Sequence, residues 1–198
     1  MITALLIPGL GDRTRFIEFL VRGWKREGVN PVVLSVAWSK QTESIDSKLE
    51  KLYAHVDQLS ASGSRISVVG CSAGASLAVN LFFLRQASIE RVICICGRLK
   101  VGELKGFRGF ARRCVGCPAF AESVRRCEGV IGVLDQSQRQ RILTVRARMG
   151  DELVPPATST FPGLPQMELD TIGHAVSIAS AFLFYSRSLT TFLKGEAK

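Results

Sequence analysis

The chain is poor in histidine, with only His55 and His174 among 198 residues, and this limits the metal sites that it can form. A structural zinc site usually takes two C-x-x-C pairs, or one pair with histidines at a fixed spacing. Cys114 and Cys117 form one such pair, and only Cys127 lies nearby in the sequence. Buried or loop thiols are therefore favoured over a zinc or redox site, and no metal is expected. The six cysteines are Cys71, Cys94, Cys96, Cys114, Cys117 and Cys127.

Long hydrophobic runs are also absent. No window approaches the roughly 18 uninterrupted apolar residues of a membrane span, so no span is expected. Residues 1–9 lack a basic start, and their apolar run is too short for an export signal with a cleavage site. We therefore expect a cytosolic protein whose thiols are reduced.

The sequence has no repeats, low-complexity segments or long charge runs, so little disorder is expected. A single domain over 1–198 suits this length, because such a chain buries roughly 70% of its unfolded surface and needs no metal or disulfide to fold. Acidic residues are scarce, with 17 Asp and Glu against 26 Lys and Arg, which gives a net charge of +9 at pH 7.

The basic residues are dense between 98 and 113, where Glu103 is the only acid. We interpret this segment as a solvated basic face in preference to a site for an anionic partner, and expect no specific nucleic-acid binding. Its bases are Arg98, Lys100, Lys105, Arg108, Arg112 and Arg113.

Short β-branched runs alternate with longer amphipathic segments along the chain, a pattern that predicts βαβ units around a parallel sheet. In the first amphipathic segment, Phe16, Phe19, Leu20 and Trp24 recur at helical spacing. The predicted fold is a three-layer α/β/α sandwich with a mainly parallel sheet of about six strands. Strands are expected over 2–7, 31–36, 65–69, 91–96, 141–146 and 167–170. Helices are expected over 14–27, 42–59, 72–85, around 118–127, and over 175–193.

A G-x-S-x-G motif centred on Ser72 lies between the third predicted strand and the helix that follows it. This is the context of a nucleophile elbow, a turn that forces the serine into a strained backbone conformation. Gly70 and Gly74 keep side chains from crowding the turn, and the hydroxyl would project at the positive end of a helix. We predict that Ser72 is a nucleophile; the alternative is a glycine-lined turn without chemistry.

Loops after the last two predicted strands supply an acid and a base. Ligands of parallel sheets bind beyond the carboxyl ends of the strands. Asp151 and Glu152 follow the fifth strand, and His174 follows the sixth. Asp151 is preferred because it comes first and has the shorter side chain, with Glu152 as the alternative. A nucleophilic serine needs a base, and the rival, His55, falls within a predicted helix, so His174 is the predicted base.

The chain order Ser72, Asp151, His174 matches that of α/β-hydrolases. The sequence resembles this superfamily over nearly its whole length, and looks like a minimal member that begins at the family's third strand. Two departures stand out. Pro8-Gly9 replaces the His-Gly of many members, and Cys71 precedes the serine where many have a histidine or an aromatic residue.

The resemblance implies a serine hydrolase that cleaves a small-molecule carboxylic ester or thioester by two-step acyl transfer. Ser72 would attack the carbonyl, His174 would take and return the proton, and Asp151 would fix the imidazole tautomer. The backbone N–H groups of Leu10 and Ala73 would form the oxyanion hole. This chemistry needs no cofactor.

Similar enzymes place a cap between the fourth and fifth strands, which here corresponds to residues 97–135. Phe107, Phe110 and Phe120 would line an acyl pocket or act as a lid there, or would simply pack the segment down. The alternative function is a non-catalytic α/β-hydrolase-like protein that binds an acidic partner through its basic face. The sequence does not indicate an oligomeric state.

Overall fold

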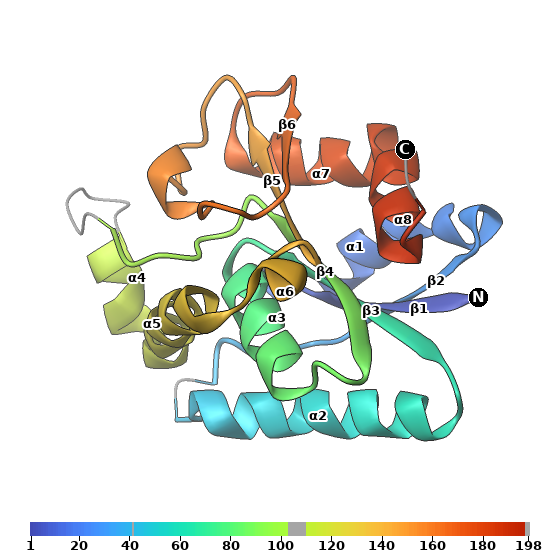
Figure 1. Ribbon diagram of the computed structural model, residues 1–198. Coiled ribbons are helices and arrows are strands. Elements are labelled where there is room, and N and C mark those ends of the chain that lie inside the picture. The colour runs from blue at the N-terminus through green and yellow to red at the C-terminus, as the bar shows by residue number, and fades with distance from the viewer. Residues whose placement is uncertain (41, 103–109, 197–198) are drawn as a thin grey trace.

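The computed structural model describes residues 1–40, 42–102 and 110–196. Within them, a parallel sheet of six strands lies between two layers of helices (Figure 1), which confirms the predicted α/β class. The order of the strands across the sheet is β2-β1-β3-β4-β5-β6. They are β1 (Ile2–Ile7), β2 (Val29–Val33), β3 (Arg65–Cys71), β4 (Ile89–Ile95), β5 (Ile142–Ala147) and β6 (Gln166–Leu169).

Each face of the sheet has its own apolar core because successive side chains of a strand point to opposite faces. Leu5 and Ile7 of β1 join one core, and Ala4 and Leu6 join the other. The first core is covered by α2 (Ile45–Ala61), α3 (Ala73–Leu84), α4 (Phe110–Gly116) and α5 (Pro118–Val133). The second is covered by α1 (Thr14–Val21), the 3₁₀ turn η1 (Trp24–Glu27), α7 (His174–Phe184) and α8 (Ser186–Lys194). Two short elements, α6 (Gln136–Arg139) and η2 (Pro156–Thr158), flank β5 in the sequence.

The sheet has a topological switch at β1, which pairs with β2 on one side and β3 on the other. The connection through α1 covers one face, and the connection through α2 covers the opposite face. Such a switch opens a crevice beyond the carboxyl ends of the two central strands. The loop after β1 and the turn after β3 therefore meet at the place where a ligand site is expected.

Two segments predicted as single helices are divided, so those predictions were wrong in extent. The segment 14–27 forms α1 and then η1, and the segment 175–193 forms α7 and α8. The axes of α7 and α8 are bent by 69° to one another. No single helix among the described residues is long and apolar enough to cross a membrane; α7 and α8 reach that length and hydropathy only when they are taken together.

The second strand begins and ends earlier than predicted, at 29–33 instead of 31–36. Pro31 lies inside it without penalty because β2 is an edge strand, where a missing backbone N–H faces no partner. In the predicted cap segment, the described residues form α4 and α5, and α5 packs directly against α3. A lid function for this segment stays a prediction.

Candidate active site

Ser72 occupies a strained turn between β3 and α3. Its backbone has φ 53° and ψ −117°, a region that non-glycine residues rarely adopt, and its N–H donates to the Ile95 carbonyl at 2.9 Å. Both motif glycines are needed sterically. A Cβ on Gly70 would lie 2.5 Å from the Cα of Ala75, and one on Gly74 would collide with the Ile7 carbonyl. The elbow geometry predicted from the motif is present.

The loop after β1 passes directly over this serine. A Cβ on Gly9 would lie 2.8 Å from the Cβ of Ser72 and 3.3 Å from its Oγ, so only glycine lets the loop come this close. Leu10 follows in the loop, and Ala73 is the first residue of α3. Within the described part of the chain, the N–H groups of Leu10 and Ala73 donate to no protein acceptor. They are thus free to donate to a ligand beside Ser72.

His174 and Asp151 form a buried pair. Nδ1 of His174 lies 2.7 Å from Oδ2 of Asp151, and the two side chains are 8% and 7% exposed. The other carboxylate oxygen accepts the N–H groups of Leu153 and Val154 at 2.8 and 2.9 Å. A carboxylate held in this way fixes the proton on Nδ1 and leaves the lone pair on Nε2. Nε2 is buried and has no hydrogen-bond partner among the described residues.

Glu152, the alternative acid, binds the backbone of His174 and not its ring. Its Oε2 accepts the backbone N–H of His174 at 2.9 Å, at the first residue of α7. A carboxylate at this position satisfies an otherwise unpaired helix N–H and interacts favourably with the helix dipole. Gly173, the residue before His174, has a φ of 84°, in the left-handed region that suits glycine. Glu152 therefore anchors the backbone of His174, while Asp151 holds its ring.

Ser72 and His174 line one cleft of about 320 Å³. Its walls come from the loop after β1, from α1 and from the start of α7, and they are mostly apolar. The hydroxyl and Nε2 make no direct hydrogen bond here, and such contacts often tighten only when substrate binds. The lining residues are Pro8, Gly9, Leu10, Gly11, Arg13, Phe16, Ile17, Cys71, Ser72, Leu153, His174, Ala175 and Ile178. His55, the rival base, is exposed on α2 and does not line the cleft.

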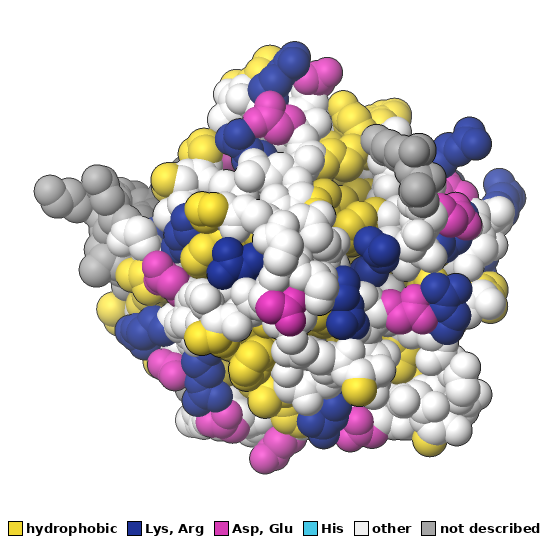
Figure 2. Space-filling model, viewed as in Figure 1, with side chains coloured by type: hydrophobic (Ala, Val, Ile, Leu, Met, Phe, Trp, Pro, Cys, Tyr) yellow, Lys and Arg dark blue, Asp and Glu magenta, His cyan; other side chains and the backbone are white. Residues whose placement is uncertain are grey.

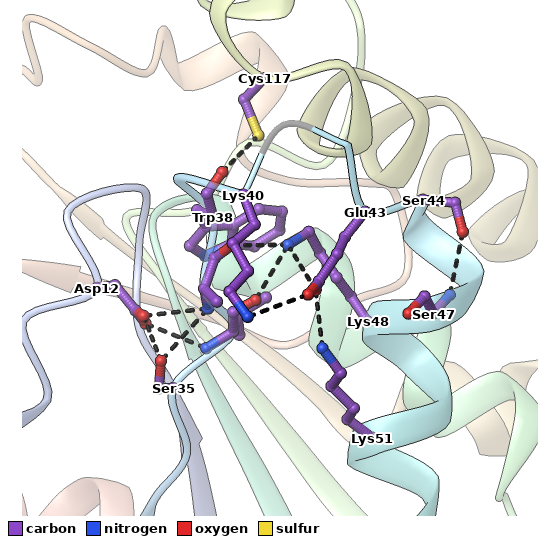
Figure 3. Close-up of polar contacts among 12 residues, drawn as sticks. Asp12, Ser35, Trp38, Lys40, Glu43, Ser44, Ser47, Lys48, Lys51 and Cys117 are labelled. Atoms are coloured by element: carbon purple, nitrogen blue, oxygen red, sulfur yellow. Dashed lines mark hydrogen bonds and ion pairs between the residues drawn. The ribbon is translucent and has the colours of Figure 1, made fainter.

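The loop that carries Leu10 is tied down by a polar network (Figure 3). Oδ1 and Oδ2 of Asp12 accept the N–H groups of Val36 and Ala37, each at 3.1 Å, and Oδ2 also accepts the hydroxyl of Ser35. The indole Nε1 of Trp38 donates to the Pro8 carbonyl at 3.1 Å. The segment 35–38 thus fixes both ends of the loop that lies over Ser72.

A buried lysine holds that segment from the other side. Lys48 of α2 is 1% exposed, and its ammonium donates to the carbonyls of Val36 and Ala37 at 3.1 and 2.8 Å. Oε2 of Glu43 lies 3.5 Å from the same nitrogen (Figure 3). A hydrogen bond from Lys51, with the charges of Lys51 and Lys48, lowers the pKa of Glu43 to about 2. No sequence motif predicts the contacts of Lys48, because its two hydrogen bonds go to backbone carbonyls.

Two of the three predicted pocket residues, Phe110 and Phe120, do not line the cleft. Phe110 and Phe120 are buried and pack edge to face, with ring centroids 5.5 Å apart. Phe120 also packs edge-on against Trp38 at 6.3 Å. These two rings belong to the core, as in the simple packing alternative. Phe107 lies outside the described residues.

The basic segment differs from a uniformly solvated face. Arg98 is 4% exposed, because its guanidinium donates to the carbonyls of Lys100 and Val101 and lies over the ring of Phe110. Placing Arg98 on a solvated face was therefore wrong. Lys105 and Arg108 lie outside the described residues, as do the side chains of Arg112 and Arg113.

Most of the thiols are buried in the core. Burial raises the pKa of Cys94 and Cys96 to about 12, and it also raises those of Cys71 and Cys127. The Sγ of Cys117 contacts the Trp38 carbonyl at 3.6 Å. In the described ranges, no three His, Cys, Asp or Glu side chains are grouped so that they could hold a metal ion.

No protein-family model matches this sequence, and no curated protein matches it significantly. Solved structures do match. Monoacylglycerol lipase of Paleococcus ferrophilus has a TM-score of 0.69 and 13% identity, over 98% of this chain and 95% of that one. The meta-cleavage product hydrolase of Pseudomonas fluorescens IP01 has a TM-score of 0.69 and 13% identity, over 98% and 91%. A structure described under the metagenome-derived lipolytic enzymes LipS and LipT has a TM-score of 0.65 and 15% identity, over 98% and 94%. At these identities, the likeness shows a shared fold.

Proposed function

We propose that this chain, which has the fold of the α/β-hydrolase superfamily, is a serine hydrolase that cleaves a carboxylic ester or thioester. One observation carries the proposal. The imidazole of His174, oriented by Asp151 at 2.7 Å, keeps an unpaired Nε2 in the cleft that also holds the strained Ser72. Burying an imidazole nitrogen without a hydrogen-bond partner costs free energy. A role for Nε2 in taking the Ser72 proton when a substrate is bound explains why this cost is accepted.

The mechanism follows from these groups. The Ser72 oxygen attacks the carbonyl carbon while Nε2 of His174 takes its proton, and the oxyanion accepts the N–H groups of Leu10 and Ala73. The imidazolium, stabilised by Asp151, then protonates the departing alcohol or thiol. Water then attacks the acyl carbon while giving a proton to the same nitrogen. When the bond to the Ser72 oxygen breaks, His174 returns that proton to Ser72 and the acid is released. Apolar walls around the cleft support a substrate with an apolar acyl part.

The test is labelling with a fluorophosphonate probe, together with hydrolysis of short p-nitrophenyl esters. We expect wild-type protein to be labelled at Ser72, and Ser72→Ala to lose labelling and at least about 10³-fold in kcat. The His174→Ala variant should lose activity to a similar extent, since the two groups act as a unit. Thermal unfolding of each variant checks that it is folded. Folded wild-type protein that is neither labelled nor active would overturn the proposal.

A further inference from the structure

Exposed apolar side chains concentrate on α1 and α7. On α1, Ile17, Leu20 and Val21 face the sheet, while Phe16 and Phe19 point away from it and are 49% and 54% exposed. These two helices pack against each other. We call their shared surface the α1–α7 face. The exposed apolar residues of the two helices are Phe16, Phe19, Val176, Leu183 and Phe184, and Ile172 is exposed in the loop just before α7.

Unlike an ordinary surface helix, α7 is apolar on its outer side as well as on its inner side, where Ala181 and Phe182 are buried in the core. Ser177 and Ser180 are buried, whereas Val176 and Leu183 are 58% and 48% exposed. A helix on a protein surface normally directs its apolar stripe inward and its polar residues outward. The buried hydroxyl of Ser177 is satisfied, because it donates to the Gly173 carbonyl at 2.6 Å. The outward stripe is therefore an apolar surface available for a partner, of the kind that marks interaction sites.

This face is hollowed and adjoins the candidate active site. A hollow of about 750 Å³ lies between α1, η1 and the end of α7, with Phe19, Trp24 and Leu183 among its walls. It contains neither Ser72 nor His174. One turn earlier on α1, Phe16 lines the cleft that does contain them. The apolar face thus continues from the hollow to the mouth of the cleft.

Arginines border the face without acidic partners. Arg22 and Arg26 line the hollow, and Arg13 lines the cleft. Among the described residues, none of these three forms an ion pair with a carboxylate. Glu27, which also lines the hollow, accepts hydrogen bonds from Ser186 and Thr190.

Other surfaces differ. On the side shown in Figure 2, basic and acidic side chains lie next to one another. Arg126 pairs with Asp46, and Arg85 pairs with Asp57, on the helices of the other face of the sheet. The α1–α7 face combines its exposed apolar side chains with three arginines that form no ion pair among the described residues, and the exposed Glu18 of α1 is an acid without an ion pair in the same ranges.

We propose that the α1–α7 face docks on the surface of an anionic phospholipid bilayer. Exposed phenylalanines would enter the boundary between headgroups and acyl chains, and Arg22 and Arg26 would meet lipid phosphates. The guanidinium of Arg22 already lies over the ring of Phe19, at 4.4 Å from its centroid. A second copy of this chain fits less well, because a two-fold interface would bring the same arginines together. Docking does not depend on Ser72; delivery of a lipid-borne ester to the cleft rests on the proposed function.

The first test is co-sedimentation with vesicles of phosphatidylglycerol and phosphatidylcholine, and with vesicles of phosphatidylcholine alone. We expect binding to the anionic vesicles, unchanged in Ser72→Ala. Replacing Phe19→Ser together with Leu183→Ser should weaken it about ten-fold. The matched control is Phe83→Ser with Leu84→Ser, which removes residues that are 38% and 47% exposed on α3. This control should bind as the wild type does.

The second test separates the effect of the arginines on the α1–α7 face from the effect of the overall net charge on vesicle binding. The double variant Arg22→Gln, Arg26→Gln should weaken vesicle binding about ten-fold or more. Arg65→Gln with Arg125→Gln removes as much charge from exposed positions elsewhere, and should have a much smaller effect. Equal losses in both pairs would reduce the binding to non-specific attraction and overturn the proposal. An absence of vesicle binding would also overturn the proposal. The same holds for a dimer in size-exclusion chromatography that Phe19→Ser with Leu183→Ser converts to a monomer.

Activity links the face to the cleft. Phe19→Ser with Leu183→Ser should hydrolyse a short soluble ester as fast as the wild type, because neither residue lines the cleft. If this variant loses vesicle binding but still hydrolyses the soluble ester, the result supports a docking surface that is separate from the catalytic groups. If no ester is cleaved but the vesicle results hold, the proposed function fails and the docking surface stands.

Discussion

A single carboxylate, that of Asp151, joins a backbone turn to the imidazole of His174 through its two oxygens. Asp151→Asn keeps the shape but offers an amide, which favours the wrong tautomer of the ring. We expect kcat to fall by about 10⁴-fold with little change in KM. Steady-state kinetics on a soluble ester measures this.

The neighbouring carboxylate provides the control for that experiment. In Glu152→Gln, the amide oxygen still accepts the His174 N–H, and only the interaction of the charge with the helix dipole is lost. We expect a loss of about 0.3–1 kcal/mol in unfolding free energy and a change in kcat of only a few-fold. If Glu152→Gln lost as much activity as Asp151→Asn, the assignment of separate roles would be wrong.

Trp38 acts on the candidate oxyanion loop through one hydrogen bond to the Pro8 carbonyl. In Trp38→Phe a smaller aromatic ring replaces the indole and the donor is removed, so the loop over Ser72 gains freedom. We expect kcat to fall about ten-fold while KM stays within two-fold, since loop position matters most for the charge of the transition state. The control is Trp24→Phe, because the Nε1 of this buried tryptophan has no partner within the described residues. Equal effects of the two variants on kcat would contradict a positioning role for Trp38.

Local signals made some site residues predictable and left others hidden. Ser72 has its own glycine-flanked motif, and Asp151 and His174 come directly after predicted strands. Trp38 lies 30 residues from the carbonyl that it binds, and no side-chain motif marks that partner. Such contacts are fixed by the tertiary fold, and periodicity in one sequence does not encode them.

At the scale of elements, α2 holds the segment 35–38 in place through Lys48. Lys48→Met would leave the Val36 and Ala37 carbonyls without their buried donor, and we expect a loss of roughly 2–4 kcal/mol in unfolding free energy. Lys51→Met, one turn along the same helix, removes a lysine that is 55% exposed and should cost less than about 1 kcal/mol. Urea denaturation of both variants measures the difference. Similar losses would show that the buried ammonium has no special structural role.

The strands were predicted more accurately than the helices, for a physical reason. Buried parallel strands are short apolar runs with turn residues at each end, and five of the six both begin and end within about two residues of expectation. The break between α7 and α8 falls at Tyr185, where no proline or glycine interrupts the sequence. It reflects how the two helices pack on the sheet. Likewise, α1 has apolar residues on two sides, so periodicity alone did not show that Phe16 and Phe19 face outward.

At the scale of the whole molecule, carboxylates paired with bases join the helices that cover one face of the sheet. Asp46 of α2 and Glu122 of α5 share Arg126, and its hydrogen bonds lower the pKa of both carboxyls. Arg85 at the end of α3 likewise lowers the pKa of Asp57 on α2. A lowered pKa means that the folded protein binds these protons less tightly than the unfolded chain does. The stabilisation is therefore present above the unfolded pKa values and is lost as pH falls through the folded ones.

Glu43 allows that linkage to be tested at one position, because its pKa falls from an ordinary 4.5 to about 2 beside Lys51 and Lys48. We expect the unfolding free energy to decline between pH 4.5 and pH 2, and Glu43→Gln to decline less steeply there because one linked proton is missing. Glu50→Gln, an exposed change on α2 at a residue without an ion pair in the described ranges, should follow the wild type. Urea titrations at several pH values measure these slopes. A Glu43→Gln slope equal to that of the wild type would mean that the contacts of Glu43 with Lys51 and Lys48 persist equally in the unfolded chain, and the linkage argument would then fail at this residue.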